Sequence, residues 1–301
     1  MLNRKNKLLL LKVLSLFSVV RGYNILVIAL AQYLASIYIL SPNLPLRQVV
    51  FDVNLFVIVI ASAMVIAGGY IINNFYDAEK DLINKPRKSM LDRLVSQRFK
   101  LTTYFVLNFM AVIAASYVSF RAVFFFSSYI FGIWLYSHKL KKIPLLGNFI
   151  SATLAITPFF VVFVYYRNFE TVIFVHAFFL FLLILAREMI KDLENISGDI
   201  AQNYRTIPII YGAKTSKTII SLLILLTLLP SLLLIFKFDV GYMNFYFTIC
   251  VLLLVLFIFL LSRAETKKDY VWLHNILKLI IVGGVFSILL IDVDLVLNRI
   301  L

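Results

Sequence analysis

The sequence predicts an all-α, polytopic membrane protein with about nine transmembrane helices. Of its 301 residues, 62% are hydrophobic and only 15% are charged, and the mean hydropathy is +0.96. A soluble globule of this composition would leave too much apolar surface in water. Several apolar runs reach the roughly 20 residues that a helix needs to cross a bilayer. No low-complexity segment or linker divides the chain, so we expect a single domain over residues 1–301.

The expected spans follow one another with short polar connections. The first contains Arg21 and lacks a small-residue cleavage pattern, so it is a span and not a cleavable signal. The pairs Gly68-Gly69 and Gly283-Gly284 are expected to allow close helix approach or a kink in the second and last spans. Only Arg121 separates the third run from the fourth, so this pair also fits one long hairpin or a tilted span. The spans cover about residues 15–38, 53–75, 101–119, 121–137, 147–166, 171–190, 217–237, 242–262 and 271–297.

Basic residues are concentrated on one side of this topology. Of the 29 Lys and Arg residues, 22 lie at the N-terminus and in the even-numbered connections, and five lie on the opposite side. The positive-inside rule therefore places the even-numbered connections in the cytoplasm, and the C-terminus outside. We expect a multi-pass protein of a bacterial or archaeal cell membrane, in contact with membrane lipids. Topology explains the net charge of +14, and no nucleic-acid partner is expected because no basic folded domain or motif is present.

Several kinds of site are absent from the sequence. The lone cysteine, Cys250, excludes a disulfide within the chain and a cysteine-based zinc site. The three histidines are scattered without the spacing of metal ligands, and no P-loop or G-x-G-x-x-G stretch occurs. These absences argue against a P-loop ATPase and a dinucleotide-binding fold.

Two acidic clusters follow directly on apolar runs. Asn73, Asp77 and Asp81 stand at i, i+4 and i+8, which on a helix keeps them on one face, roughly 6 Å apart. Glu188, Asp192, Asn195 and Asp199 stand at i, i+4, i+7 and i+11, which also predicts a single stripe. Unpaired carboxylates at a membrane are costly and indicate function. Oxygen-rich stripes favour Mg²⁺, which proteins hold with a few carboxylates and substrate phosphates.

The first cluster and its surroundings resemble the UbiA superfamily of intramembrane prenyltransferases. The resemblance covers nearly the whole chain. It rests on the N-x-x-x-D-x-x-x-D signature from Asn73 to Asp81 and the following Ile83-Asn84-Lys85-Pro86-x-Lys88, on Arg21 and Asn24 in the first span, on the stretch Tyr136–Asn148, and on Gly198-Asp199 at the end of the second cluster. It implies a nine-helix bundle with the active site on the cytoplasmic side.

The resemblance also implies a reaction and a site. An isoprenyl diphosphate loses pyrophosphate, and a lipophilic acceptor captures the allylic cation. Asn73, Asp77 and Asp81 are expected to hold one Mg²⁺–diphosphate, and Asp192 and Asp199 the other, so that Asp77, Asp81, Asp192 and Asp199 carry the catalysis. Glu188 and Asn195 are expected to complete the second site, although many family members carry Asp where this chain has Asn195. The expected substrate-binding residues are Arg21, Asn24, Lys85, Arg87, Tyr136 and Lys141.

The second acidic signature indicates which acceptor class to expect. Its R-E-x-x-K-D run, followed by G-D and R-T-I-P, resembles the branch of the family that alkylates geranylgeranylglyceryl phosphate. A quinone-precursor aromatic acceptor, or one of the chlorophyll or tocopherol type, is the alternative. From another class, an ion-coupled transporter also places acids in membranes, but it predicts them near span midpoints. Here the acids follow the spans at their cytoplasmic ends.

Overall fold

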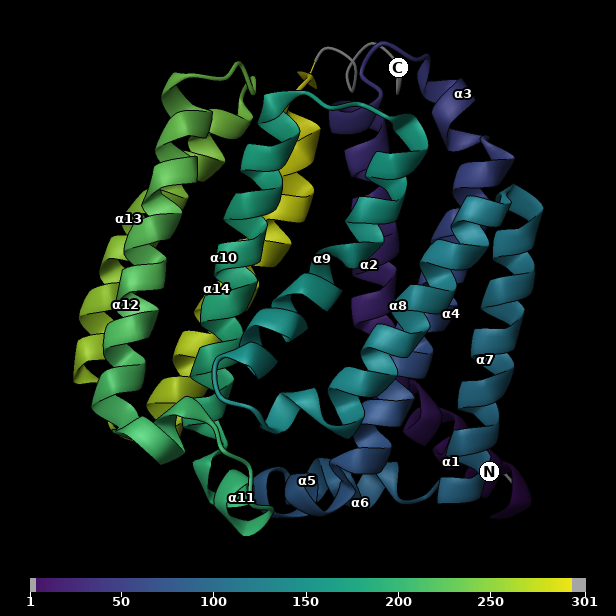
Figure 1. The fold of residues 1–301 in the computed structure, drawn as a ribbon, viewed down its shortest axis with the longest axis vertical. Coiled ribbons are helices and arrows are strands. Elements are labelled where there is room, and N and C mark those ends of the chain that lie inside the picture. Colours follow the sequence, from purple (N-terminus) through teal and green to yellow (C-terminus); the bar gives the residue numbers. More distant parts are fainter. Residues whose placement is uncertain (1–3, 294–301) are drawn as a thin grey trace. The chain divides into compact units, whose positions relative to one another are not determined.

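The computed structural model describes residues 4–293, and in that range all the regular elements are helices. This confirms the all-α class. The helices are α1 (Arg4–Val20), α2 (Gly22–Ala35), η1 (Ser36–Leu40), α3 (Leu46–Val50), α4 (Val53–Tyr76), α5 (Ala78–Asn84), α6 (Pro86–Asp92), α7 (Gln97–Val118), α8 (Phe120–His138), η2 (Leu140–Lys142), α9 (Leu146–Tyr166), α10 (Thr171–Glu194), α11 (Ile196–Ala201), α12 (Ile207–Phe236), α13 (Met243–Arg263), α14 (Lys267–Ser287) and η3 (Ile288–Leu290) (Figure 1).

Nine helices in the described range are long and apolar enough to cross a membrane, which confirms the predicted number of spans. The third and fourth spans are two separate helices, joined at Ser119. Ser119 has extended backbone angles, and its hydroxyl accepts a hydrogen bond from the Ala122 N–H at 3.1 Å, which starts α8. The predicted last span, 271–297, runs partly outside the described residues. Arg299, one of the basic residues counted for the topology, also lies outside them.

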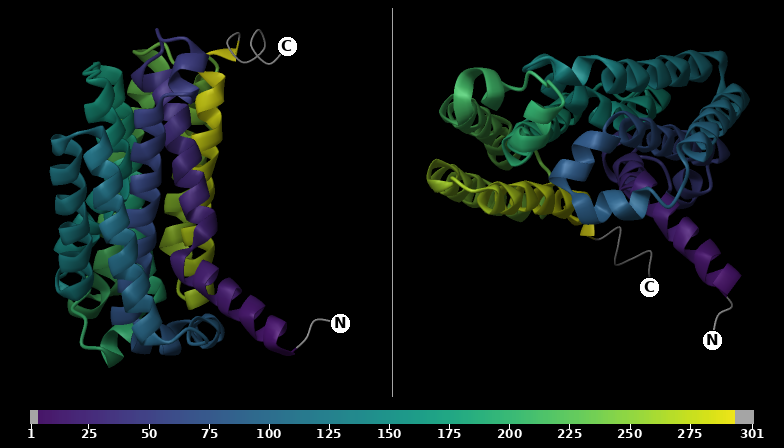
Figure 2. Two further views of the ribbon diagram at one scale, coloured as in Figure 1. Left: turned by 90° about the vertical axis from the view of Figure 1, so that its right-hand side faces the viewer. Right: turned by 90° about the horizontal axis from the view of Figure 1, so that it is seen from below.

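Two predicted span boundaries were wrong. The first span begins at Gly22 and not near residue 15, because the helix is interrupted at Arg21, whose φ is +51°. Figure 2 shows that α1, which precedes this break, runs obliquely to α2, which follows it. The seventh span begins at residue 207, ten residues earlier than expected, and is interrupted at Gly212 with φ +83° and ψ +160°. The polar residues that follow Gly212 conceal this first part of the span from a hydropathy reading.

The chain forms two compact units, each made of segments that are far apart in sequence. The first unit contains 1–29, 52–141 and 197–204, and the second contains 30–51, 142–196 and 205–301. The single domain expected over residues 1–301 therefore stays a prediction.

Within the first unit, α4 packs along α7 and α8, and α1 contacts α4 and α6 (Figure 1). Within the second unit, α10 packs against α9, α12 and α14, and α13 contacts α12 and α14. Fully buried side chains such as Leu183, Phe247 and Leu277 form the core of the second unit. In the first unit, Val19, Ile71 and Tyr104 join α1, α4 and α7. These packed helices hold the polar residues described next.

Candidate active site

The first acidic cluster lies where α4 continues into α5 in the first unit. Asp77 sits at the junction with φ −94° and ψ 6°, but the backbone hydrogen bonds of the helix continue through it. The Asp77 N–H donates to the Asn73 carbonyl at 2.9 Å, and the Asp81 N–H donates to the Asp77 carbonyl at 2.8 Å. The three residues therefore keep the i, i+4, i+8 spacing of a helical stripe, as their sequence predicts.

Asp77 is a buried carboxylate with two long-range partners. The Lys141 ammonium, from η2, donates to Asp77 Oδ1 at 2.6 Å and to Asn73 Oδ1 at 3.3 Å. The Tyr204 hydroxyl, which follows α11 in the chain, donates to the same Asp77 oxygen at 2.8 Å. Burial raises the pKa of Asp77, but the charges of Lys141 and Lys80 outweigh burial, so its pKa lies below the usual value. Asp77 is therefore ionised, and its charge is matched by a neighbouring ammonium.

Asp199 lies on α11, also in the first unit, and its side chain is fully buried. Lys80, from α5, forms an ion pair with this carboxylate and also lies over the Tyr204 ring, 4.3 Å from the centroid. Burial raises the pKa of Asp199, and Lys80 offsets part of that effect. The neighbouring Gly198 N–H donates to Asn84 Oδ1 at 3.1 Å. A Cβ at Gly198 would overlap the Asn84 carboxamide, so a larger residue here would displace the side chain that accepts this hydrogen bond.

Three cations act on the charge of Asp81. Burial and the neighbouring Asp77 raise the pKa of Asp81, whereas Lys85, Lys88 and Arg21 lower it, so all three are close enough to act on its charge. The Arg21 guanidinium lies 5.0 Å from the centre of the Tyr70 ring. Three other predicted substrate-binding residues also belong to the first unit. Asn24 donates to the Tyr70 hydroxyl at 3.2 Å, Arg87 is exposed on α6, and Tyr136 lies on α8.

The second unit holds the other acids at the end of α10. Ser151 on α9 donates to Glu188 Oε2 at 3.0 Å, and Asn148 on α9 donates to Asp192 Oδ2 at 2.8 Å. Glu188 and Asp192 therefore share the face of α10 that meets α9. Lys191 donates to both Glu188 oxygens, at 2.8 and 2.7 Å. The structure thus joins the predicted acids of α10 to a hydroxyl, a carboxamide and an ammonium.

A second group of charged residues joins the end of α10 to α14. The two ring nitrogens of His274 lie 3.1 Å from Arg187 Nη2 and 3.2 Å from Glu194 Oε2. Because arginine can only donate, His274 Nε2 accepts this bond and Nδ1 carries the proton toward Glu194. These two contacts connect the charged end of α10 to α14.

The single stripe predicted from Glu188 to Asp199 is wrong, because α10 ends at Glu194. Asn195 is the residue that caps α10, with φ −110° and ψ 12°, and its side-chain Nδ2 donates to the Lys191 carbonyl at 2.7 Å. A carboxamide that bonds its own helix end favours termination, which a count of residues does not reveal. Asp199 belongs to the separate helix α11 and to the first unit, whereas Asp192 belongs to the second. Their joint action at one cation stays a prediction.

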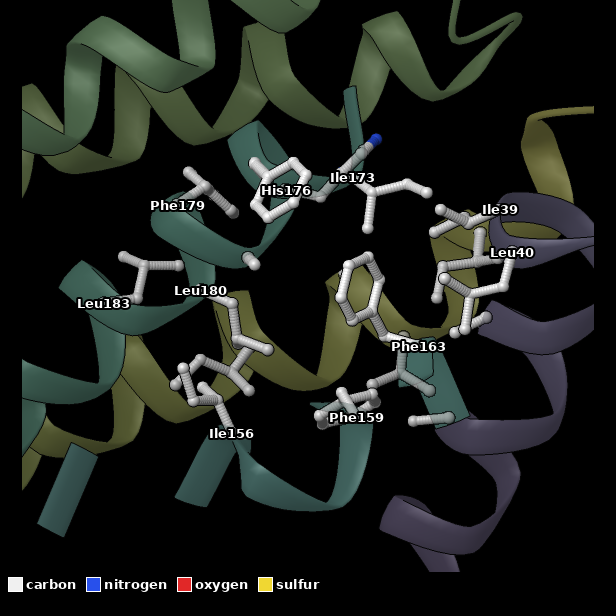
Figure 3. Close-up of a pocket in the computed structure, with 18 of the residues that line it drawn as sticks. Ile39, Leu40, Ile156, Phe159, Phe163, Ile173, His176, Phe179, Leu180 and Leu183 are labelled. Atoms are coloured by element: carbon white, nitrogen blue, oxygen red, sulfur yellow. The ribbon is translucent and has the colours of Figure 1, made fainter. Parts of the chain in front are cut away.

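An apolar cavity of about 250 Å³ lies within the second unit. It is lined by α2, η1, α9, α10, α13 and α14, and Figure 3 shows Ile39, Phe163, Phe179 and Leu180 among its walls. The cavity residues on α9 follow Asn148 in the chain, and those on α10 precede Asp192. The cavity has the surface chemistry of a site for hydrocarbon.

The first cluster has the donors that a hard cation requires. The oxygens of Asn73 and Asp77 already converge on one positive charge, the Lys141 ammonium. In the part of the chain that the structure describes, no three acidic, histidine or cysteine side chains gather around one point. A cation here would therefore draw on an amide oxygen and on substrate oxygens as well as carboxylates, which is usual for Mg²⁺.

Comparison with known proteins shows the family of the chain. The model of the UbiA prenyltransferase family matches residues 30–279. The chain belongs to the UbiA prenyltransferase family. This confirms the resemblance inferred from the signatures, and with nine apolar helices it makes the chain an integral, multi-pass membrane protein of a prenyltransferase family.

Relatives and solved structures extend the match. Digeranylgeranylglyceryl phosphate synthase of Methanobrevibacter smithii is 29% identical over 262 residues, covering 83% of this chain and 88% of that protein. The same-named protein of Thermococcus sibiricus is 34% identical over 167 residues, covering 55% and 59%. A solved structure concerning digeranylgeranylglyceryl phosphate synthase has a TM-score of 0.71 at 21% identity, covering 94% of this chain and 99% of the other. A UbiA homolog from Archaeoglobus fulgidus, bound to GPP and Mg²⁺, has a TM-score of 0.66 at 13% identity, covering 91% and 99%.

Six residues interact with the predicted acids in the structure but were not among the site residues expected from the sequence. They are Lys80, Lys88, Asn148, Ser151, Lys191 and Tyr204. Lys80 lies inside the first signature and Lys191 inside the second, so their spacing offered a signal. Asn148 closes the stretch that carried part of the resemblance. Tyr204 offered no comparable signal, because only folding brings it to Asp77.

Proposed function

We propose that this UbiA-family chain transfers a prenyl group from an isoprenyl diphosphate to an acceptor of the geranylgeranylglyceryl phosphate type, with Mg²⁺ as cofactor. The observation that carries the proposal is the convergence of Asn73 and Asp77 oxygens on one cationic point, set among further lysines. The acceptor is supported by relatives named digeranylgeranylglyceryl phosphate synthase. A related fold bound to GPP and Mg²⁺ supports the donor and the metal.

The acidic and amide side chains are proposed to bind Mg²⁺. Asn73, Asp77 and Asp81 are proposed to hold one Mg²⁺ in the first unit, which also contains Asp199. Asp192 and Asp199 are proposed as ligands of the other Mg²⁺, and Glu188 and Asn195 as further oxygen donors for it. Bound Mg²⁺ supplies positive charge that stabilises the departing diphosphate.

Lysine and arginine side chains are proposed to hold the diphosphate. Lys141 reaches the first cluster directly, and Lys85 and Arg21 are close enough to act on Asp81. Positive groups aimed at a leaving diphosphate stabilise the charge that develops as the C–O bond ionises. The apolar cavity of the second unit is suited to prenyl hydrocarbon, and excluding water there protects the allylic cation from hydrolysis.

Metal removal tests the cofactor assignment. Purified protein in detergent, given geranylgeranyl diphosphate, geranylgeranylglyceryl phosphate and Mg²⁺, should form the doubly alkylated lipid. Excess EDTA should abolish the reaction, and added Mg²⁺ or Mn²⁺ should restore it, because the proposed ligands are hard oxygens. Product is measured by mass spectrometry of the extracted lipid. Full activity in excess EDTA would contradict the metal assignment.

The same assay compares acceptors. Transfer to 4-hydroxybenzoate or homogentisate without transfer to the glycerophosphate would replace the acceptor but keep the prenyltransferase. No transfer to any acceptor, together with ion flux in proteoliposomes, would favour the transporter instead.

The site is proposed to face the cytoplasm of an archaeal or bacterial cell, as the bias of basic residues indicates. Single cysteines at Met90 and Phe120, which are 66% and 85% exposed before and after α7, test this orientation. In right-side-out vesicles, Phe120→Cys should react with an impermeant thiol reagent, and Met90→Cys should react only after the vesicles are opened. The native Cys250 is buried and gives little background. The reverse pattern would overturn the orientation.

A further inference from the structure

Asp92, the last residue of α6, is a buried carboxylate outside both acidic clusters. Its exposed fraction is 3%, and it accepts hydrogen bonds from side chains of two other helices. Ser18 Oγ on α1 donates to Asp92 Oδ1 at 3.0 Å, and Asn74 Nδ2 on α4 donates to Asp92 Oδ2 at 3.1 Å. The Lys88 ammonium lies 4.0 Å from the same carboxylate. A buried charge with this many partners is costly to leave unpaired, so it fixes the groups around it.

Asn74 extends this arrangement to α7. Lys100 Nζ donates to Asn74 Oδ1 at 2.9 Å, and Lys100 is 1% exposed. Lysine can only donate and an ionised aspartate can only accept, so the Asn74 carboxamide has one possible orientation. Ser18, Asn74, Asp92 and Lys100, here called the Asp92 cluster, therefore tie α1, α4, α6 and α7 together.

The Asp92 cluster also reaches Arg21 through Ser18. The Ser18 carbonyl accepts a hydrogen bond from the Arg21 N–H at 3.2 Å, at the end of α1. Arg21 has the left-handed φ of +51°, which a side-chain-bearing residue keeps only when its surroundings hold it there. Its guanidinium lies over Tyr70, one turn of α4 before Asn74. Docking of Ser18 on Asp92 thus holds the end of α1 at which Arg21 turns.

We propose that Asp92 is a positioning residue that, through Ser18, fixes the break at Arg21 and so aims the guanidinium at phosphate oxygens of the bound prenyl diphosphate. The inference rests on the proposed function for the identity of the ligand. Asp92 itself touches neither the substrate nor Asp81, and it acts on the conformation of Arg21.

A double-mutant cycle tests whether Asp92 acts through Arg21. Asp92→Asn should raise KM for geranylgeranyl diphosphate about tenfold, the scale of one lost charge-assisted hydrogen bond, with kcat changed less than about threefold. In an Arg21→Ala background, Asp92→Asn should raise KM no further, because the group it positions is already gone. Binding of the non-reactive thiolodiphosphate, measured by calorimetry, should follow the same pattern. Equal effects of Asp92→Asn in both backgrounds would overturn the proposal.

Two further variants separate positioning from folding. Lys100 donates to Asn74, which in turn donates to Asp92, so Asp92→Asn removes the negative charge at the far end of this bridge from the buried ammonium. Asp92→Asn/Lys100→Met should therefore recover thermal stability while KM stays high. Recovery of KM together with stability would show that Asp92 and Lys100 have only a structural role. Ser18→Ala removes one hydrogen bond and no charge, and it should raise KM in the wild-type background and not in Arg21→Ala. This variant decides the question if Asp92→Asn fails to fold.

Asp52→Asn is the matched control. Asp52 caps the opposite end of α4 by accepting from the Asn54 and Leu55 N–H groups, and asparagine caps helices about as well as aspartate. KM should stay at the wild-type value, and a rise equal to that of Asp92→Asn would overturn the assignment. A wild-type protein that binds no thiolodiphosphate would instead contradict the proposed function. Wild-type binding with unchanged affinity in both Ser18→Ala and Asp92→Asn would contradict only the role of Asp92.

Discussion

Asp77→Asn is expected to lower the rate of prenyl transfer at least about a hundredfold, the scale of losing one strong electrostatic contact to a transition state. The substitution keeps the size of the side chain and removes the charge on which Lys141 and Tyr204 converge. It leaves the Lys141 ammonium buried with a neutral partner, so the free energy of unfolding should also fall, by about 1–3 kcal/mol. Transfer to geranylgeranylglyceryl phosphate and thermal unfolding in detergent measure the two effects.

A double variant distinguishes lost chemistry from lost stability. Asp77→Asn/Lys141→Met removes both charges of the pair, and replacing a buried ion pair with uncharged groups is often neutral or stabilising. Stability should therefore return, whereas transfer should stay at least about a hundredfold below wild type. Near-normal transfer by Asp77→Asn would contradict the proposed role of the first cluster. Recovered transfer in the double variant would assign Asp77 a structural role only.

Asp199→Asn is expected to produce a loss of similar size, at least about a hundredfold in transfer rate. The surroundings of Asp199 differ from those of Asp77. The Asp199 carboxylate is fully buried and forms its ion pair with Lys80, which also lies over Tyr204. Losing this negative charge weakens cation binding. The Mg²⁺ concentration at half-maximal activity should therefore rise, and a titration of activity against Mg²⁺ measures the shift.

Asp239→Asn provides the control for that experiment. Asp239 is exposed in the turn before α13, where its carboxylate accepts a hydrogen bond from the Gly241 N–H at 3.2 Å. Transfer and the Mg²⁺ requirement should both match those of the wild-type protein. If Asp199→Asn behaves like this control, Asp199 is not a ligand, and the second signature contributes through α10 alone.

The local features of the site could be predicted from the sequence. Hydropathy over a window of about 20 residues depends only on neighbours in the chain, so the sequence predicted nine spans. It left the pair around Ser119 open between two helices and one long hairpin or tilted span, and the structure shows two helices. The spacing of Asn73, Asp77 and Asp81 is equally local, because the helix that joins them needs no distant partner. The same local reasoning failed at Asn195, where a side-chain bond to the helix end stops α10 and removes Asp199 from the stripe.

By itself, then, the sequence determined the class of the fold, the number of spans and the helical spacing of the first cluster, because periodicity and hydropathy act within one helix. Only the tertiary structure decided which charges meet. Lys141 is 64 residues from Asp77 and Tyr204 is 127 residues from it, yet both bond to one carboxylate oxygen. Asp92 lies in no sequence motif. Its hydrogen bonds to α1 and α4, and the link from α4 to Lys100 on α7, form only when these helices pack together with α6. A buried charge is stable only beside its partners, and packing of distant segments chooses those partners.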